Sequence, residues 1–541
     1  MGAWWRKTQV NARLRPLPQV LRKLPDDSIL LAERLAELAS TLPLDEAGFL
    51  LGRSYSTTLP LEFRSTNGVF YTPPPVVERL LDNAEQAGID WARHSVLDPA
   101  CGGGAFVAPV ARRMLRALEG ADPRVAARSV AARLRGYEID PFSAWLTGCL
   151  TDATITAELG ELPKGLEGII DVGDTLKREL NAPLFDLVIG NPPYGRLRLP
   201  PKSRTKFERS LFGHANLYGV FLDFAVHVAK PESGVIAFVT PTGFLCGEYF
   251  KNLRSLLGRD APPLMLDFVS EREGVFDDVL QETLLTVFRK GAKGNARVHF
   301  VSADDDGSVV ASPGGTFELP SPSDVPWIVP RSPEAKGLAK RLRSLPTRLS
   351  DWGYRVATGP LVWNRFKDRL RDEKIRGAVP LLWAESVSPD GLFEFRAARR
   401  NHSPYFVAHA DEEHLLVRTS CVLLQRTTAK EQSRRLIAAQ LPQRFIDDAG
   451  GAVTVENHLN MLLPTVATPA VTPTALAAFL NSEAADNAFR CISGTVAVSA
   501  YELESLPLPS VKELAFLEKA IARGASASTI KAACNPLYVV D

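Results

Sequence analysis

Short apolar runs alternate with longer segments of helical periodicity between about residue 65 and residue 300. The runs around Val96–Leu97 and Leu187–Ile189 lack the polar alternation of a half-exposed strand, which is typical of strands covered on both faces of a parallel sheet. The segments between such runs, for example PVVERLLDNA and NLYGVFLDFAVHVAK, carry apolar residues at helical spacing. This alternation predicts an α/β fold with a doubly wound sheet.

The pattern differs on either side of this α/β region. Before about residue 60 the leucines of SILLAERLAELAS lie at helical spacing, so we expect a helical arm over residues 1–60. The α/β domain is expected over residues 61–318, and a Pro/Ser-rich stretch indicates a linker over residues 319–344. Irregular strands, loops rich in Trp, Tyr and Arg, and helical segments then predict a mixed α+β domain over residues 345–541.

The composition is that of an ordinary globular protein, with 541 residues of which 45% are hydrophobic and 23% are charged. No apolar run approaches the length of a bilayer-spanning helix, and the first residues lack the apolar core of a signal peptide, so we expect a cytoplasmic protein without a membrane partner. The six cysteines lie far apart without a Cys-x-x-Cys or Cys/His cluster, which argues against structural zinc and disulfides. No metal is expected.

Positive charge is concentrated in particular segments, although the net charge of the chain is only +1. Residues 196–209 contain many Lys and Arg side chains and one acid, Glu208. The first residues of the chain and the region from Lys336 to Arg376 are also basic. Any one basic run is more often a solvated surface, but several of them in one chain fit a partner with a phosphate backbone.

Polar side chains stand where successive strands are expected to end, namely Asp98, Glu138, Asp174 and Asn191. Since open α/β sheets bind ligands at the carboxyl ends of their strands, we expect these residues to line one rim. Gly102–Gly104 follow the first of them and open a helix, as in a nucleotide-binding turn. Glu138 would hold a ribose diol and Asp174 an adenine amino group. Each acid alone is more often a cap or a solvated turn, and the missing GxGxxG fingerprint weakens a nicotinamide interpretation.

The sequence Asn191-Pro192-Pro193-Tyr194 follows the strand predicted at Leu187–Ile189. The prolines fix φ and remove backbone donors, so the loop is stiff and its carbonyls point in set directions. An amide, a rigid carbonyl and an aromatic ring suit a flat molecule with an NH2 group. Hydrogen bonds from that group to Asn191 Oδ1 and the Pro192 carbonyl would draw its nitrogen toward tetrahedral geometry and free its lone pair for attack. The alternative is a proline-rich turn with a partly buried tyrosine.

The chain contains, in this order, TPPPVVERLL, DPACGGGAF, YEIDP, GDT, NPPY, GVIAFVTPTGF and VFDDV. This order resembles that of the gamma-class, Taq-type DNA adenine-N6 methyltransferases of restriction-modification systems. The resemblance implies a Rossmann-like class I methyltransferase sheet, a following target-recognition domain and an S-adenosylmethionine cofactor. It implies that Asn191, the Pro192 carbonyl and Tyr194 hold an adenine flipped out of double-stranded DNA, with Phe276 as a second stacking aromatic. The predicted cofactor contacts are Thr72, Asp98, Ala100, Gly102, Glu138, Ile139, Asp174 and Asn191.

Double-stranded DNA is the partner that this resemblance implies, in the prokaryotic cytoplasm and at the nucleoid. The predicted DNA contacts are Arg196, Arg198, Lys202, Arg365, Arg399 and Arg400. Stacking is the role assigned to Tyr194, so Tyr194→Phe should keep much of the activity. The sequence contains no convincing nuclease arrangement, and it leaves open whether a separate cognate endonuclease acts with this chain.

Two other functions stay open. The NH2 group could belong to cytosine N4, RNA or a protein glutamine; cytosine-N4 enzymes more often have Ser in place of Asn191, and the glutamine enzymes lack a large Arg- and aromatic-rich domain. The chain could also be a catalytically silent DNA-specificity protein that keeps the fold. The intact NPPY sequence and the strand-end acids argue against that alternative, and cofactor binding distinguishes it from an enzyme.

Overall fold

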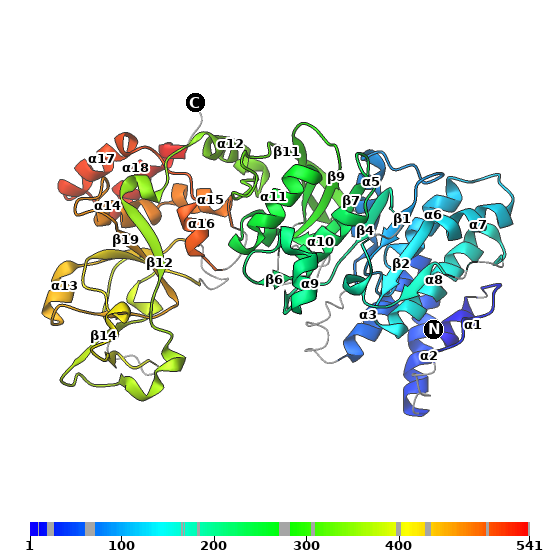
Figure 1. Cartoon of the computed structure of the whole chain (residues 1–541), viewed down its shortest axis with the longest axis horizontal. Coiled ribbons are helices and arrows are strands. Elements are labelled where there is room, and N and C mark those ends of the chain that lie inside the picture. The colour runs from blue at the N-terminus through cyan, green and yellow to red at the C-terminus, as the bar shows by residue number, and fades with distance from the viewer. Residues whose placement is uncertain are drawn as a thin grey trace. The chain divides into compact units, whose positions relative to one another are not determined.

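The computed structural model describes residues 1–8, 10–18, 26–59, 71–163, 166, 168–180, 184–269, 282–303, 309–396, 402–427, 434–493 and 497–538. The chain forms two compact units (Figure 1). Unit 1 comprises Met1–Phe244 and Tyr249–Asp324, and unit 2 comprises Leu245–Glu248 and Val325–Asp541. Within the described ranges, no helix has the length and apolar character that crossing a membrane requires.

The described part of unit 1 contains a nine-stranded sheet in the order β11-β10-β8-β9-β7-β4-β1-β2-β3. The strands are β1 (Val96–Asp98), β2 (Leu134–Glu138), β3 (Ile170–Val172), β4 (Leu187–Gly190), β7 (Val235–Pro241), β8 (Pro263–Val269), β9 (Thr283–Arg289), β10 (Ala296–Ala303) and β11 (Val309–Phe317). The run from β3 to β7 is parallel, and β9 is antiparallel to both β7 and β8. The order of the strands reverses between β1 and β4, which is where open α/β sheets bind ligands.

The apolar runs form strands because both faces of the sheet are covered. Every residue of β4 and β7 is buried, as expected for parallel strands rich in Val, Ile and Leu. Side chains of the helices α5, α6 and α7 share one apolar cluster with β1, β4 and β7. The helices around the sheet are α5 (Pro74–Gln86), α6 (Val107–Arg116), α7 (Pro123–Arg133), α8 (Pro141–Leu159), α10 (Leu217–Val228) and α11 (Lys251–Asp260) (Figure 1). The doubly wound α/β fold expected from the sequence is confirmed.

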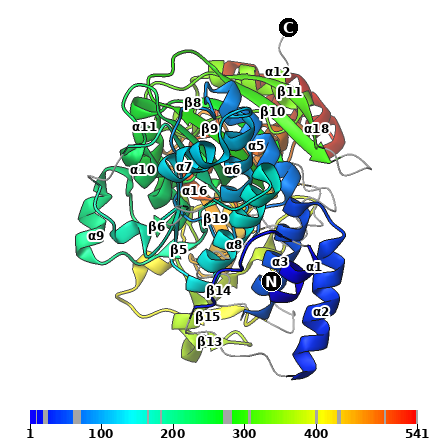
Figure 2. The ribbon, with the colours of Figure 1, turned by 90° about the vertical axis from the view of Figure 1, so that its right-hand side faces the viewer.

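Residues 1–59, which we call the N-terminal arm, contain α1 (Gly2–Lys7), α2 (Asp26–Ser40) and α3 (Leu44–Thr58). Trp4 and Trp5 are buried in one apolar cluster with Trp145 of α8. The Arg15 guanidinium pairs with the carboxylate of Asp152, also on α8, at 2.6 Å. The arm therefore packs against α8, as Figures 1 and 2 both show.

A buried charged cluster joins α5 to the strands β8 and β10. The carboxylate of Asp267, which is fully buried, accepts hydrogen bonds from Arg79 Nε and Asn83 Nδ2, each at 2.8 Å. The same carboxylate lies 2.8 Å from His299 Nδ1. Burial opposes ionisation of Asp267, but the hydrogen bonds from His299 and Asn83 and the charge of Arg79 outweigh burial and lower its pKa.

We expect Asp267→Asn to destabilise unit 1, because removal of one partner from a buried ion pair typically costs about 3–5 kcal/mol. The pKa of Asp267 in the folded protein lies below the value of about 4 that an Asp has in the unfolded chain. The ionised carboxylate therefore stabilises the fold fully above about pH 4, and this stabilisation is lost as the pH falls through the lowered pKa. The difference in melting temperature between parent and variant, compared between about pH 5 and about pH 2, should therefore shrink as the solution becomes more acid. Thermal unfolding across this range measures it, with Glu119→Gln, an exposed acid of the same unit, as control. A difference that grows on acidification would contradict the assignment.

Unit 2 is a mixed α+β unit, and its described residues form two four-stranded sheets in the orders β12-β19-β16-β17 and β13-β15-β14-β18. The strands are β12 (Tyr354–Thr358), β13 (Leu370–Arg371), β14 (Ala378–Leu382), β15 (Tyr405–Val407), β16 (Cys421–Gln425), β17 (Ala438–Leu441), β18 (Thr454–Val455) and β19 (Leu459–Pro464). The helices include α12 (Lys336–Ser344), α13 (Gln443–Asp448), α14 (Pro473–Leu480), α15 (Glu483–Arg490), α16 (Ala500–Glu504), α17 (Val511–Ala522) and α18 (Ala527–Cys534).

The boundary between the units falls after Asp324, inside the segment 319–344 for which a linker is predicted. Much of this segment is packed rather than extended. Trp327 and Val329 are fully buried, and Trp327 N donates to the Leu245 carbonyl at 2.7 Å. The prolines and serines that indicate a linker here flank apolar side chains that belong to the core of unit 2.

Candidate active site

The ends of adjacent parallel strands meet at one edge of the unit 1 sheet. The strands β3, β2, β1 and β4 are neighbours in this order. Asp98 and Glu138 close β1 and β2, Asn191 directly follows β4, and Asp174 comes shortly after β3. The structure therefore brings these four residues to a shared rim, where the sequence pattern predicts them.

The carboxyl group of Asp98 is buried next to β4. Asp98 is 2% exposed, and its Oδ1 accepts a hydrogen bond from Ala100 N at 3.1 Å. Glycine suits the end of β4 beside it, because a Cβ on Gly190 would lie 2.6 Å from Asp98 Oδ1 and would displace this carboxyl group. Burial, and to a smaller degree the charge of Glu138, raise the pKa of Asp98 to about 8, although the Ala100 N–H group opposes this. The raised pKa favours the protonated carboxyl group, which can donate as well as accept a hydrogen bond.

Glu138 joins the glycine turn to the turn that precedes α8. Its Oε2 accepts from Gly102 N at 2.8 Å, and its Oε1 accepts from Asp140 N at 2.8 Å. Burial raises the pKa of Glu138, against the lowering effect of these N–H groups. Gly102 has φ +51° and open space where a Cβ would stand, so a ligand can approach the backbone at this point.

Exposed apolar side chains flank Glu138. Ile139 is 57% exposed, and Val172 at the end of β3 is 53% exposed. Apolar surface beside a few convergent polar groups is typical of sites for small molecules that contain a flat ring. The rim offers a carboxylate for ribose hydroxyls, apolar surface for a base and an open glycine turn. These residues fit the S-adenosylmethionine that the sequence implies.

Asp174 caps a short helix, and a cap is the structural alternative that the sequence pattern also allowed for this acid. Its Oδ1 accepts from Leu176 N at 3.0 Å and so caps the short helix η1 (Thr175–Lys177). Its Oδ2 lies 3.3 Å from Lys177 Nζ. The role of Asp174 toward a ligand stays a prediction. The rim acids form no metal site, since no suitable group of His, Cys, Asp or Glu side chains occurs among the residues that the structure describes.

The side-chain amide of Asn191 is held between two hydroxyl groups. Asn191 Nδ2 donates to Thr72 Oγ1 at 3.1 Å, and Tyr194 Oη donates to Asn191 Oδ1 at 2.7 Å. Tyr194 Oη also lies 3.4 Å from the Val239 carbonyl of β7. Burial raises the pKa of Tyr194, so its hydroxyl stays protonated and remains a donor. Because a carbonyl oxygen has two lone pairs, Asn191 Oδ1 can accept one further hydrogen bond in a fixed direction.

A hairpin that we call the basic hairpin follows Tyr194 and spans residues 195–216, with β5 (Arg196–Leu197), α9 (Pro201–Lys206) and β6 (Ala215–Asn216). Some of its cations are used in internal contacts. Lys206 Nζ donates to the Leu176 carbonyl at 3.0 Å and so ties the hairpin to the short helix η1 after Asp174. The guanidinium of Arg209 pairs with the buried carboxylate of Asp223 at 2.6 Å.

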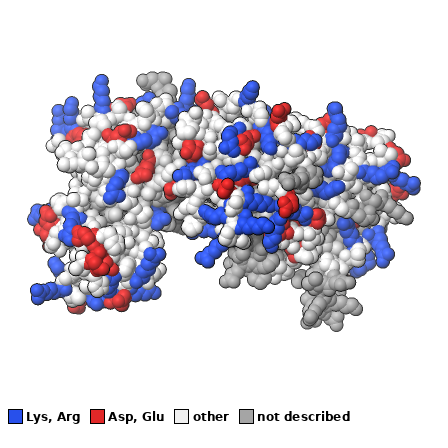
Figure 3. Space-filling model, in the orientation of Figure 1, with Lys and Arg blue, Asp and Glu red and all other residues white. Residues whose placement is uncertain are grey.

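Other cations of the basic hairpin are exposed. The side chains of Arg196, Arg198 and Lys202 have no hydrogen bond or ion pair to any residue within the described ranges. Figure 3 shows Lys and Arg side chains gathered near the middle of the visible face, over the region of α9 and β6. The sequence predicted these three residues as DNA contacts, and the structure leaves their charges available to a partner.

The remaining predicted site residues lie elsewhere. Phe276, Arg399 and Arg400 fall outside the described residues. Arg365 is exposed at the end of the short helix η7 (Trp363–Arg365) in unit 2. Its predicted contact with DNA, and the target-recognition role predicted for unit 2, stay predictions.

Several contacts at the rim were missed by sequence reasoning. Thr72 was assigned to the cofactor alone, although its hydroxyl contacts Asn191, which lies 119 positions away. The hydroxyl of Tyr194, the tie made by Lys206 and the contact of Tyr55 with Asp140 were not expected. A tyrosine in a helix and a lysine in a basic run look like ordinary surface residues, so no local motif could have indicated these roles.

The known proteins that resemble this chain include methyltransferases and restriction-modification enzymes. Residues 162–276 match the model of the Eco57I restriction-modification methylase family. The type II methyltransferase M.BsuBI of Bacillus subtilis is 28% identical over 331 residues, which cover 60% of this chain and 65% of that protein. M.PstI of Providencia stuartii is 25% identical, with 62% of this chain and 66% of that protein covered. M.TthHB8I of Thermus thermophilus is 30% identical, with 61% of this chain and 67% of that protein covered.

The matched regions thus span slightly less than two thirds of M.BsuBI and M.PstI. Among solved structures, the type IIL restriction-modification enzyme MmeI, determined in complex with DNA, has a similar fold. The TM-score is 0.54 at 14% identity, over 91% of this chain and 79% of MmeI. This likeness extends over both units and supports the fold described above.

Proposed function

The chain belongs to the Eco57I-type restriction-modification methylase family, and on this premise we propose that it transfers a methyl group from S-adenosylmethionine to the N6 amino group of an adenine in double-stranded DNA. The observation that carries the proposal is the amide of Asn191, fixed by Thr72 and Tyr194 at the end of β4 beside the acidic rim. The names of the relatives, which are type II methyltransferases, support the type of reaction.

Binding of the cofactor is assigned to the rim between β3 and β4. Glu138 would accept hydrogen bonds from the ribose hydroxyls, and Ile139 and Val172 would contact the adenine ring. The buried carboxyl group of Asp98 and the open backbone at Gly102 would hold the remainder of the molecule. When bound, S-adenosylmethionine supplies a sulfonium methyl group that is already a good electrophile. The protein therefore has only to position the acceptor and polarise it.

Activation of the acceptor is assigned to the Asn191-Pro192 pair. An adenine amino nitrogen is a poor nucleophile because its lone pair is delocalised into the ring. Hydrogen bonds from its N–H groups to Asn191 Oδ1 and to the Pro192 carbonyl favour the tetrahedral form, in which the lone pair is free. The hydroxyl of Tyr194 donates to Asn191 Oδ1 and so restricts the orientation of the amide, which supports this role.

A base inside a duplex cannot reach this rim, so the target adenine has to leave the stack. Stacking on the ring of Tyr194 would offset part of that cost, which amounts to a few kcal/mol. The exposed cations of the basic hairpin begin directly after Tyr194 and would contact phosphates next to the flipped nucleotide. Recognition of the DNA sequence is assigned to unit 2.

The most informative test is sequencing of modified bases in DNA from cells that express this chain alone. We expect N6-methyladenine at one defined sequence, and none in cells that express Asn191→Ala. N4-methylcytosine instead would replace the proposed substrate, and methylated RNA or protein glutamine with unmodified DNA would refute DNA as substrate. A parent protein that binds S-adenosylmethionine with no transfer to any of these would identify a catalytically silent specificity protein.

We expect loss of the free cations in the basic hairpin to weaken DNA binding evenly on all sequences. Each phosphate contact contributes about 0.9 to the slope of log affinity against log salt concentration. The combined change Arg196→Gln, Arg198→Gln and Lys202→Gln should therefore lower the slope by nearly 3 units. Binding measured between about 50 and 200 mM salt tests this, with Arg124→Gln, an exposed arginine on α7, as control. An unchanged slope would exclude phosphate contacts at this hairpin.

A further inference from the structure

Helix α3 of the N-terminal arm contacts the turn that connects β2 to α8. Tyr55 Oη donates to Asp140 Oδ2 at 3.0 Å, and the ring of Tyr55 packs on that of Phe142 with centroids 4.2 Å apart. The same oxygen of Asp140 accepts from Ser143 N at 2.9 Å and caps α8. The backbone N–H group of Asp140 donates to Glu138 Oε1 at 2.8 Å. A short chain of hydrogen bonds thus runs from the arm to the carboxylate assigned to the ribose.

A second contact joins α3 to the glycine turn through the ring of Tyr71. A Cβ on Gly52 of α3 would lie 2.0 Å from this ring, and a Cβ on Gly103 would lie 2.2 Å from it. The ring is therefore packed directly against the backbone at both glycines. Any side chain at Gly52 would push the ring toward Gly103.

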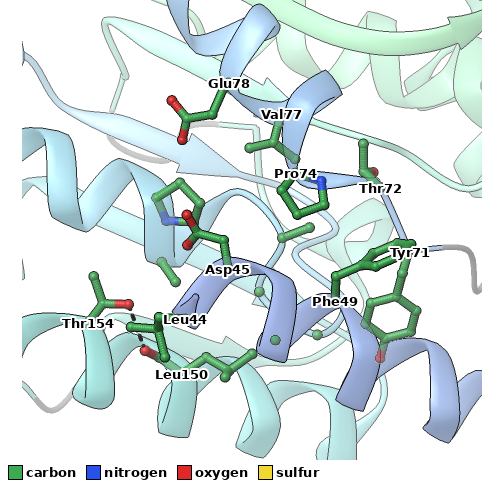
Figure 4. Close-up of a pocket in the computed structure, with 16 residues that line it drawn as sticks. Leu44, Asp45, Phe49, Tyr71, Thr72, Pro74, Val77, Glu78, Leu150 and Thr154 are labelled. Carbon is green, nitrogen blue, oxygen red and sulfur yellow. Dashed lines mark hydrogen bonds between the residues drawn. The ribbon is translucent and has the colours of Figure 1, made fainter. Parts of the chain in front are cut away.

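A small cavity of about 30 Å³ lies in the same region (Figure 4). Its walls come from α3, from the segment that leads into α5, from the glycine turn, and from α5, α6 and α8. The lining includes Leu44, Asp45, Gly48 and Phe49 of α3, Thr72 and Pro74, and Gly103 and Gly104. The arm therefore forms one wall of a hollow that also reaches Thr72 and the glycine turn, two parts of the predicted cofactor site.

We propose that the N-terminal arm is part of the cofactor site and that Tyr55 is a positioning residue, which holds the Glu138–Asp140 turn in the conformation that binds the ribose. This inference rests on the proposed function, because it assigns the arm to the same cofactor. No chemical role is predicted for residues 1–60 from the sequence pattern.

The hydroxyl of Tyr55 is suited to this task because it stays a donor. Burial, together with the negative charges of Asp140 and Glu138, raises the pKa of Tyr55. Removal of the hydroxyl leaves Asp140 Oδ2 with the donors of Ser143 alone, so that the turn keeps its helix cap but loses its tie to the arm. The free protein then samples more conformations of Glu138, and binding has to select among them.

The test is isothermal calorimetry with S-adenosylmethionine and with S-adenosylhomocysteine on the full chain. Tyr55→Phe keeps the ring contact with Phe142 and should raise both dissociation constants about 3- to 10-fold, as expected for one hydrogen bond. In steady-state assays KM for S-adenosylmethionine should rise, while kcat and the affinity for DNA stay unchanged. The control is Thr57→Val, which removes an exposed hydroxyl that bonds only within α3.

Gly52→Ala provides an independent variant, since it drives the Tyr71 ring toward Gly103. We expect a loss of cofactor affinity of more than 10-fold, against no change for Gly337→Ala, a helical glycine with open space at the Cβ position. If the parent binds cofactor and Tyr55→Phe binds it within about twofold, the inference is wrong and the proposed function stands. A fall of kcat and DNA affinity in step with melting temperature would also overturn it, since that marks a merely structural role. A parent that binds neither compound would refute the proposed function itself.

Discussion

Replacement of Asn191 by alanine is expected to slow single-turnover methylation by about 10²–10³-fold, while affinity for duplex DNA changes little. The amide oxygen is needed only as the amino nitrogen becomes tetrahedral, so its loss removes an interaction that is stronger in the transition state than in the bound substrate. The magnitude corresponds to the loss of one polar group aimed at the reacting atom. Rapid mixing of preformed enzyme, DNA and S-adenosylmethionine measures the chemical step directly.

Matched variants separate this role from a structural one. Asn295→Ala, in the exposed turn between β9 and β10, controls for the loss of an asparagine side chain. If Pro192, Pro193 and Tyr194 only shape a turn, Asn191→Ala should lower the melting temperature and lose activity in proportion to unfolding. A folded Asn191→Ala protein with normal single-turnover rate would end the proposed mechanism.

The hydrogen bond from the Tyr194 hydroxyl changes the activity that is expected for Tyr194→Phe. Stacking alone predicts that Tyr194→Phe keeps much of the activity, but the hydroxyl donates to Asn191 Oδ1 at 2.7 Å. One neutral hydrogen bond contributes about 0.5–1.5 kcal/mol, so the phenylalanine variant should lose about 2- to 12-fold in the chemical step. Tyr194→Ala should in addition weaken capture of the flipped base, because it removes stacking worth about 1–3 kcal/mol.

The sheet and the rim could be predicted from the sequence because they follow from local periodicity. Apolar runs such as Leu187–Ile189 are buried on both faces, and the polar residue after each run has to stand at the carboxyl end of a parallel strand. Parallel neighbours then bring Asp98, Glu138 and Asn191 together without any further information. The mixed character of unit 2 followed in the same way from the change in pattern after residue 345.

The contacts that orient these residues could not be predicted. The bond from Asn191 to Thr72 and the bond from Tyr55 to Asp140 join segments that are far apart in the chain, and they depend on how α3 and α5 pack. Asp174 shows the opposite case, because its observed role as the cap of η1 was the alternative that the pattern also allowed. Periodicity decides which residues reach the rim, whereas packing decides what each side chain contacts there.

Loss of the Glu138 carboxylate should produce the second large effect, a weakening of cofactor binding by about 10- to 150-fold. Hydrogen bonds to a charged acceptor contribute about 1.5–3 kcal/mol, and Glu138→Ala leaves the ribose hydroxyls unpaired. Glu138→Gln should be intermediate, because one amide oxygen can still accept. Since burial raises the pKa of Glu138, affinity in the parent should fall on acidification at a higher pH than an exposed glutamate would give. Glu138→Gln should lose this component of the pH dependence and keep only the component that comes from Asp98. Calorimetry with S-adenosylhomocysteine between about pH 8 and pH 5 measures both effects, with Glu161→Ala, an exposed acid after α8, as control. If Glu138→Ala binds the cofactor as tightly as the parent does, the ribose does not bind this carboxylate.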